Sequence, residues 1–299
     1  MKMDRANLLT ERRLAESMTL DAMSPRQIVD LMHEQDQRAV AAVGQVRGEV
    51  EQGVELIVAA FRAGGRLIYV GAGTSGRLGV LDASDCPPTF RSDPQMVQGI
   101  IAGGDAAMFQ AQEGAEDDPV AGAAAMDQRR VDDRDVVVGI AAGGTTPFVH
   151  GALRRARERG TKTIFLTCVE RFDGEPEVDV VIRPLVGPEV LTGSTRLKAG
   201  TATKLVLNTL TTAAMVYLGK CYENLMVDLR ATNEKLWDRG ARIVATLTGL
   251  DGDAAMDLLR RADGHVKPAI VMHRLGVDLP EARRRLESAA GRLREAMNA

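Results

Sequence analysis

The sequence predicts an α/β fold in which helices cover both faces of a central parallel sheet of about five strands. Short apolar runs alternate with segments of helical periodicity, which is the pattern of repeated strand–helix units. Because nearly every position in these runs is apolar, the strands are expected to be buried on both faces, as in a parallel sheet. The runs occupy residues 66–71, 96–104, 135–144, 162–168 and 178–184.

Helical segments flank this alternating region on both sides. Residues 10–62 have apolar side chains at helical spacing, and Ser24 followed by Pro25 predicts the start of one helix. The stretch 198–220 predicts one long, mostly apolar helix; together with the N-terminal arm it favours a homodimer. We expect a helical N-terminal segment at 1–62, an α/β domain at 63–248 and a small helical domain at 249–299.

The composition argues against several classes of partner. The 38 Lys and Arg residues nearly balance 41 Asp and Glu residues, so the net charge is −3 and neither nucleic acid nor an anionic membrane is indicated. The charged start MKMDRANLLTERRL lacks the apolar core of a signal peptide, and no apolar run approaches the roughly 20 residues of a membrane span, so a cytoplasmic protein is expected. Three cysteines without CxxC spacing and four scattered histidines predict neither a disulfide framework nor a metal site.

A glycine pattern follows the first apolar run. Gly71, Gly73 and Gly76 have the GxGxxG spacing of dinucleotide-binding turns. Such turns also need an acidic residue at the end of the next strand, about 20 residues further on, to bind a ribose hydroxyl. Here the next strand ends near Asp105, more than thirty residues after Gly71. The spacing therefore argues against a nicotinamide cofactor.

Hydroxyl side chains at two strand ends indicate a different ligand. Thr74 and Ser75 lie where the first loop turns into a helix, so their hydroxyls and the free N–H groups of the first helical turn converge on one point. Thr145 and Thr146 occupy the same place in the loop AAGGTTP after the third run. Two such loops at the carboxyl edge of one open sheet suit a phosphorylated small molecule. The alternative is that these hydroxyls only cap helices.

Four longer stretches carry a resemblance to a known family. They are GAGTSGRLGVLDASDCPPTF (71–90), IAGGDAAMFQAQEGAEDD (101–118), LTGSTRLKAGTATKLVLNTL (191–210) and NLMVDLRATNEKL (224–236). Together they resemble the N-acetylmuramic acid 6-phosphate etherases of the sugar isomerase (SIS) superfamily, which has a non-enzymatic member in the glucokinase regulatory protein. The resemblance implies a three-layer αβα sandwich and no metal or organic cofactor. It also implies cleavage of the D-lactyl ether of N-acetylmuramate 6-phosphate to N-acetylglucosamine 6-phosphate and D-lactate, during cell-wall recycling.

The resemblance also implies a catalytic pair. Of the two glutamates that the family uses, the first, a general acid, falls on Asp85, whose side chain is one methylene shorter, and the second falls on Glu116. In the loop AAGGTTP the family reads close to AASGRTP, so Gly143 replaces a serine and Thr145 replaces an arginine. These are the departures of this chain from the family pattern.

The ligand contacts implied by the resemblance lie in three loops. The start of the long helix would add N–H groups and the cation of Lys198, which suit a carboxylate or phosphate. Arg77 and Arg196 are left open between ligand binding and surface or intersubunit ion pairs. The expected binding residues are Gly73, Thr74, Ser75, Gly76, Gly144, Thr145, Thr146, Ser194, Thr195 and Lys198.

Three functions compete at this point. An etherase would use Asp85 and Glu116 as acid and base. A non-catalytic sugar-phosphate sensor is favoured by the departures at Asp85 and in the loop AAGGTTP. An aldose–ketose isomerase would also place a carboxylate at a C2 proton, but the stretch DASDCPPTF favours the etherase.

Overall fold

The computed structural model describes residues 8–298, which form two units. The predicted domain boundary after residue 248 lies within the second unit, at the end of helix α7 (Glu234–Thr248). Val244 and Leu247 of this helix are buried in the same apolar core as the helices that follow, which explains why α7 joins them. The first unit comprises the residues up to Asp85 and Pro94–Thr211, and the second comprises Cys86–Asp93 and the residues from Thr212 onward.

The first unit contains a parallel sheet of five strands, as predicted. Their order is β2-β1-β3-β4-β5. Gly71 pairs with both Ile101 and Ile140, so three neighbouring strands end level at one edge. The strands are β1 (Leu67–Gly71), β2 (Val97–Ile101), β3 (Val136–Ile140), β4 (Lys162–Leu166) and β5 (Val180–Ile182).

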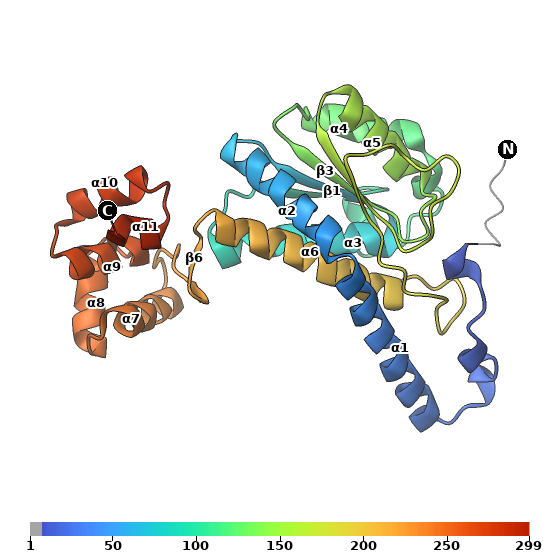
Figure 1. Cartoon of the computed structure of the whole chain (residues 1–299), viewed down its shortest axis with the longest axis horizontal. Coiled ribbons are helices and arrows are strands. Elements are labelled where there is room, and N and C mark those ends of the chain that lie inside the picture. The colour runs from blue at the N-terminus through green and yellow to red at the C-terminus, as the bar shows by residue number, and fades with distance from the viewer. Residues whose placement is uncertain (1–7, 299) are drawn as a thin grey trace. The chain divides into compact units, whose positions relative to one another are not determined.

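Two layers of helices cover the sheet and confirm the predicted αβα sandwich (Figure 1). The layers are α4 (Pro119–Arg129) and α5 (Pro147–Glu158) on one face, and α2 (Arg47–Arg62), α3 (Gly73–Phe90) and α6 (Lys198–Tyr217) on the other. Ile68 and Phe165 share an apolar core with α4 and α5. On the opposite face, Gly79 of α3 lies against Tyr69. Alternate residues of each strand thus serve alternate layers.

The N-terminal arm precedes the sheet and consists of short 3₁₀ turns followed by a long helix. The turns are η2 (Leu9–Glu11), η3 (Ala15–Ser17) and η4 (Leu20–Ala22), and the helix is α1 (Pro25–Gln45). Ser24 and Gln27 form a reciprocal capping box at the start of α1, with Pro25 at the first helical position, as the sequence predicted.

The second unit is helical apart from a small hairpin. Its apolar core includes Val227, Leu259 and Ile270. The hairpin was not predicted, because its strands have two residues each. Within residues 8–298, no helix combines the length and the apolar character that crossing a membrane requires. The further elements are β6 (Cys221–Tyr222), β7 (Leu225–Met226), α8 (Gly252–Arg261), α9 (Val266–Leu275), α10 (Leu279–Ser288) and α11 (Leu293–Asn298).

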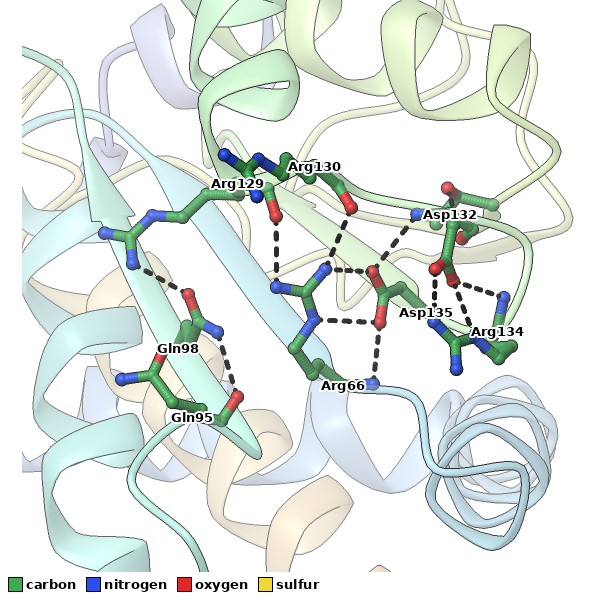
Figure 2. A network of polar contacts seen from close by, with 9 residues as sticks. Arg66, Gln95, Gln98, Arg129, Arg130, Asp132, Arg134 and Asp135 are labelled. Atoms are coloured by element: carbon green, nitrogen blue, oxygen red, sulfur yellow. Dashed lines mark hydrogen bonds and ion pairs between the residues drawn. The ribbon is translucent and has the colours of Figure 1, made fainter.

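A buried ion pair fixes the amino ends of β1 and β3 (Figure 2). Asp135 is only 2% exposed, and its carboxylate accepts hydrogen bonds from the backbone N–H of Arg66 at 2.8 Å and from Nη2 of Arg66 at 2.5 Å. The same guanidinium donates to the carbonyl oxygens of Arg129 and Arg130 at the end of α4. This network lies at the edge opposite the hydroxyl-bearing loops, so its role is to stabilise the fold.

Replacing Asp135 by Asn is expected to lower the free energy of unfolding by about 2–4 kcal/mol, because the partly buried guanidinium of Arg66 loses its charged acceptor. Asp132→Asn is a matched control, since Asp132 pairs with Arg134, whose side chain is 59% exposed. Its effect should stay below about 1 kcal/mol. Denaturant unfolding of the two variants measures the difference, and equal effects would contradict the argument from burial.

Candidate functional site

The predicted hydroxyl loops meet where the strand order changes direction. β1 lies between β2 and β3, so the loops that leave β1 and β3 are neighbours at the carboxyl edge of the sheet. Because Gly71 pairs with Ile140, the two strands end at the same level. The loops at 71–76 and 141–146 are therefore adjacent, as a ligand lying across both would require.

The glycines of the first loop have two different roles. A Cβ atom on Gly71 would lie 2.6 Å from the backbone nitrogen of Gly76, and one on Gly76 would lie 2.6 Å from Cγ1 of Ile101. Gly73 has a φ of +51°, in the left-handed region that favours glycine. The strand thus runs directly into α3, and the N–H groups of the first turn of α3 lie at the sheet edge.

The second loop carries a hydroxyl that capping does not explain. Thr146 is the N-cap residue of α5, yet its side chain makes no capping hydrogen bond. The preceding Gly144 has a φ of +78°, and a Cβ atom there would lie 2.7 Å from Cε1 of Phe172. Among the described residues, the Thr146 hydroxyl therefore has no capping role at α5. The four hydroxyl residues of the two loops, which are all half-buried, are Thr74, Ser75, Thr145 and Thr146.

A third loop, at the start of α6, joins the first two. Ser194 and Thr195 are half-buried and lie just before this helix. Gly200, in its first turn, lies so close to α3 that a Cβ atom there would be 3.6 Å from Cγ2 of Thr74. The structure therefore brings the predicted residues of the first and third loops together.

The N-terminal arm covers these loops, which the sequence did not indicate. Thr10 is fully buried, and its carbonyl oxygen accepts a hydrogen bond from the N–H of Gly193 at 3.1 Å. Its Oγ1 atom, which has no hydrogen-bond partner among the described residues, would lie 3.8 Å from a Cβ atom on Gly143. One residue of the arm thus contacts both the second and the third loop.

Lys198 lies in the core at the start of α6. Its side chain is almost fully buried, and Nζ donates to Oε1 of Gln35 on α1 at 2.6 Å. The backbone N–H groups of Lys198 and Ala199 donate to the buried carboxylate of Glu189 at 3.0 and 2.9 Å. The first turn of α6 is thus occupied by an anion of the protein itself, in the place where a ligand anion was expected. Arg196 is exposed.

A cavity of about 310 Å³ opens beside the first turn of α3. Glu116, in the short turn η6 (Ala115–Asp117), lines it together with Gly73 and Arg77. Nε of Arg77 donates to the carbonyl oxygen of Met108 at 3.0 Å, so this arginine anchors a loop at the cavity wall. Asp118 caps α4 through its side chain. Of the acidic cluster, Glu116 is therefore a side chain that faces the cavity rather than a helix cap.

The two predicted catalytic carboxyls lie on different elements of the chain, Asp85 on α3 and Glu116 in η6. Asp85 is exposed and lies twelve residues after Gly73 on α3. That separation corresponds to roughly 18 Å along the helix axis. Glu116 lines the cavity beside the first turn of the same helix. Asp82 lies on α3 three residues before Asp85, and its carboxyl accepts a hydrogen bond from the hydroxyl of Tyr69 at 3.0 Å. Burial raises the pKa of this carboxyl.

The side chain of His150 contacts the backbone of the second loop. Its Nε2 atom lies 2.6 Å from the carbonyl oxygen of Gly144 and must carry the hydrogen, because a carbonyl can only accept. The ring is nearly parallel to that of Phe172, at an angle of 14°, and edge-on to Phe165. Burial lowers the pKa of His150 and so favours the neutral ring. Nothing in the sequence distinguishes this histidine from the other three.

Replacing His150 by Leu is expected to destabilise the protein by about 1–2 kcal/mol near pH 7.5, because the carbonyl of Gly144 loses its donor. His150→Gln keeps an N–H donor and should lose less. With a folded pKa below the unfolded one, His150 should lower stability as the pH falls through about 6.5. Denaturant unfolding near pH 7.5 and 5.5 measures both effects, and an unchanged pH dependence in His150→Leu would contradict the assignment.

Comparison with known proteins identifies one family, several relatives and a structural neighbour. Residues 49–157 match the family described as the glucokinase regulatory protein N-terminal SIS domain. A protein of Salinibacter ruber, named N-acetylmuramic acid 6-phosphate etherase, is 53% identical over 97% of this chain and 94% of its own length. One of the same name from Gloeobacter violaceus is 54% identical over 97% of this chain and 95% of its own. A solved phosphoheptose isomerase from Francisella tularensis aligns with 67% of this chain and 99% of its own, with a TM-score of 0.49 and 18% identity.

Proposed function

The chain belongs to the N-acetylmuramic acid 6-phosphate etherases, which are lyases, and from this premise we propose how its own residues cleave the D-lactyl ether of N-acetylmuramate 6-phosphate. The products are N-acetylglucosamine 6-phosphate and D-lactate. The observation that carries the proposal is the cavity beside α3, where Glu116 and Arg77 lie next to the loop of Gly73. A carboxylate beside a phosphate-binding loop is the arrangement that this reaction needs.

The reaction requires proton transfers and no redox step. In the ring-opened sugar the C2 proton lies beside the aldehyde and is acidic. When a base removes this proton, its electron pair forms a C2–C3 double bond, the bond from C3 to the ether oxygen breaks, and an acid protonates the departing lactate. Water then adds its hydroxyl to C3 while C2 regains a proton, with the acid and base in exchanged roles. Neither a metal nor an organic cofactor is needed for these steps.

We assign the phosphate to the hydroxyl loops and the base to Glu116. The phosphate accepts hydrogen bonds from the hydroxyls of Thr74, Ser75 and Thr146. The N–H groups of the first turn of α3 add further donors and the positive end of the helix dipole. Arg77 adds a cation at the cavity wall. With the phosphate held there, the sugar carbons extend into the cavity towards the Glu116 carboxylate, as proximity catalysis requires.

The general acid, Asp85, is assigned across a subunit boundary. Asp85 lies eight residues after Arg77, the last residue of α3 that lines the cavity of its own chain, which is roughly 12 Å along the helix axis, so a sugar in that cavity lies beside Glu116 and away from Asp85. In a homodimer with twofold symmetry, Asp85 of each subunit would lie at the cavity of the other subunit. The dimer would then contain two equivalent sites. Cys86, Cys168 and Cys221 form no disulfide among the described residues, which supports a location in the reducing cytoplasm.

The test is an assay for D-lactate with N-acetylmuramate 6-phosphate in water enriched in oxygen-18. We expect many molecules of D-lactate per enzyme and the heavy oxygen at C3 of the sugar product. Thermal stabilisation by the substrate without D-lactate would instead assign the chain to the non-catalytic sensors. Interconversion of fructose and glucosamine phosphates would identify an isomerase.

A further inference from the structure

A second cavity lies entirely within the second unit and takes no part in the site described above. Its volume is about 220 Å³. The residues around it come from the end of α3, the segment before α7, the start of α9, and α10 with the turn that follows. Its walls combine apolar and charged groups. They are formed by Arg91, Val227, Asp228, Leu229, His265, Lys267, Pro268, Leu286, Glu287 and Gly291.

Arg91 occupies a backbone position that suits glycine. Its φ is +51°, in the left-handed region, and its N–H closes the end of α3 by donating to the carbonyl oxygen of Pro87 at 2.8 Å. Its Nη1 atom lies 3.4 Å from Nδ1 of His265 at the cavity wall. Among residues 8–298, no carboxylate lies within ion-pair distance of this guanidinium. Most of its donors therefore remain free for a ligand.

Further cations surround His265. Burial first, and then the charges of Arg91, Arg230 and Arg283, lower the pKa of this histidine. Asp263 is the carboxylate that opposes them, and it is paired with Arg283 at 2.7 Å. His265 is also the N-cap residue of α9 and makes no side-chain capping bond. The N–H of Val266 donates to the carbonyl oxygen of Leu229 and Pro268 has no N–H, so α9 adds the N–H of Lys267 and the positive end of its helix dipole to the cavity.

Two carboxylates temper this positive charge. Asp228 lies between two ammonium groups, at 2.5 Å from Nζ of Lys220 and 2.9 Å from Nζ of Lys267. One carboxylate shared by two lysines leaves a net charge of +1 in that group. Glu287 also lines the cavity and forms no ion pair with another described residue. It disfavours a ligand with two negative charges more strongly than a ligand with one.

We propose that this cavity binds a small monocarboxylate. The planar fork of Arg91 matches the two oxygens of a carboxylate, and the apolar side chains of Val227, Leu229 and Leu286 suit a short carbon chain. D-lactate, the product of the proposed reaction, is one molecule of this class. The binding itself does not depend on the etherase assignment, since the site shares no residue with the first cavity.

A single tryptophan provides the signal for a test. Trp237 of α7 is the one tryptophan of the chain, and its Cη2 atom would lie 3.3 Å from a Cβ atom on Gly264, the residue before His265. Titration with acetate and with D-lactate is expected to change the Trp237 fluorescence until it saturates. Isothermal calorimetry on the same full-length protein provides a second reading. Neither measurement requires turnover, so failure here and failure of the D-lactate assay remain distinguishable.

Arg91→Gly is the decisive variant, because glycine fits the φ of +51° and the substitution removes the guanidinium, together with the rest of the side chain, without straining the backbone. Arg130→Gly is its matched control: Arg130 has a φ of +50°, also ends a helix, and lies in the first unit. Arg91→Gly should weaken acetate binding by about tenfold or more, the value of a charge-assisted hydrogen bond. Arg130→Gly should bind acetate as the wild type does.

Three results would overturn the proposal. Equal acetate affinity in the wild type and Arg91→Gly would place the ligand elsewhere on the protein. The lack of a saturable signal in both fluorescence and calorimetry would remove the site. Tighter binding of inorganic phosphate than of acetate would show that the cavity does not select a monocarboxylate.

Discussion

Replacing Glu116 by Gln is expected to lower kcat for D-lactate release by about 10²–10⁴-fold, because an amide cannot accept the C2 proton. The side chain is exposed at the cavity wall, so the change should leave the fold and its thermal midpoint unaltered. KM should change little, since the phosphate contacts lie in the hydroxyl loops. Steady-state kinetics with N-acetylmuramate 6-phosphate measures both constants.

Glu113→Gln is the matched control for this variant. Glu113 is exposed and lines the same cavity, so the substitution removes the same charge from the same surroundings. Its kcat should remain close to that of the wild type. Equal losses in the two variants would mean that the cavity needs negative charge in general and that Glu116 is not the base.

Replacing Asp85 by Asn is expected to lower kcat by about 100-fold or more, because the departing lactate loses its proton donor. Asp85→Glu should change kcat in the opposite direction. The helix α3 continues from Gly73 to Phe90 through Pro87 and Pro88, so Asp85 lies within a helical turn just before two prolines, and its side chain remains one methylene shorter than that of glutamate. Since a misplacement of 1 Å can lower a rate by about 100-fold, the longer side chain should raise kcat measurably. A lower kcat in Asp85→Glu would show that the pocket is adapted to aspartate.

Mixed dimers extend the test to the assignment across subunits. When Asp85→Asn and Glu116→Gln chains are unfolded and refolded together, half of the dimers should contain one chain of each kind. Each such dimer would have one site with both carboxyls intact, so the mixture should regain about one quarter of wild-type activity. Activity no higher than in the separate variants would place both carboxyls of a working site on one chain.

The sheet was predictable from the sequence for a physical reason. A strand buried on both faces tolerates only apolar side chains, so runs such as 135–144 stand out from their surroundings. The meeting of the loops at 71–76 and 141–146 was predictable as well, since parallel strands that end level place their following loops at one edge. Local pattern and simple topology were sufficient for both.

Contacts between distant segments were not predictable in the same way. Lys198 stands in a polar stretch that is typical of a ligand loop, and its burial depends on Gln35 of the distant helix α1. His150 acquires its hydrogen bond only because Gly144 turns back over the start of α5. The resemblance identified Asp85 and Glu116 as a pair, and the structure places Asp85 on α3 and Glu116 in the turn η6. In each case the environment of the residue depends on a segment that is distant in the sequence, and a local sequence pattern does not predict such contacts.

The position of Thr10 also determines the order in which the site can be completed. Its carbonyl oxygen accepts a hydrogen bond from the N–H of Gly193, and its hydroxyl lies beside Gly143. The arm can therefore adopt its final position only after both loops have folded. During synthesis Thr10 leaves the ribosome far ahead of Gly193, and a contact across such a long stretch of chain forms late in folding. The first segment to be made is thus among the last to be placed, and a nascent chain acquires its covered site only when nearly the whole first unit has emerged.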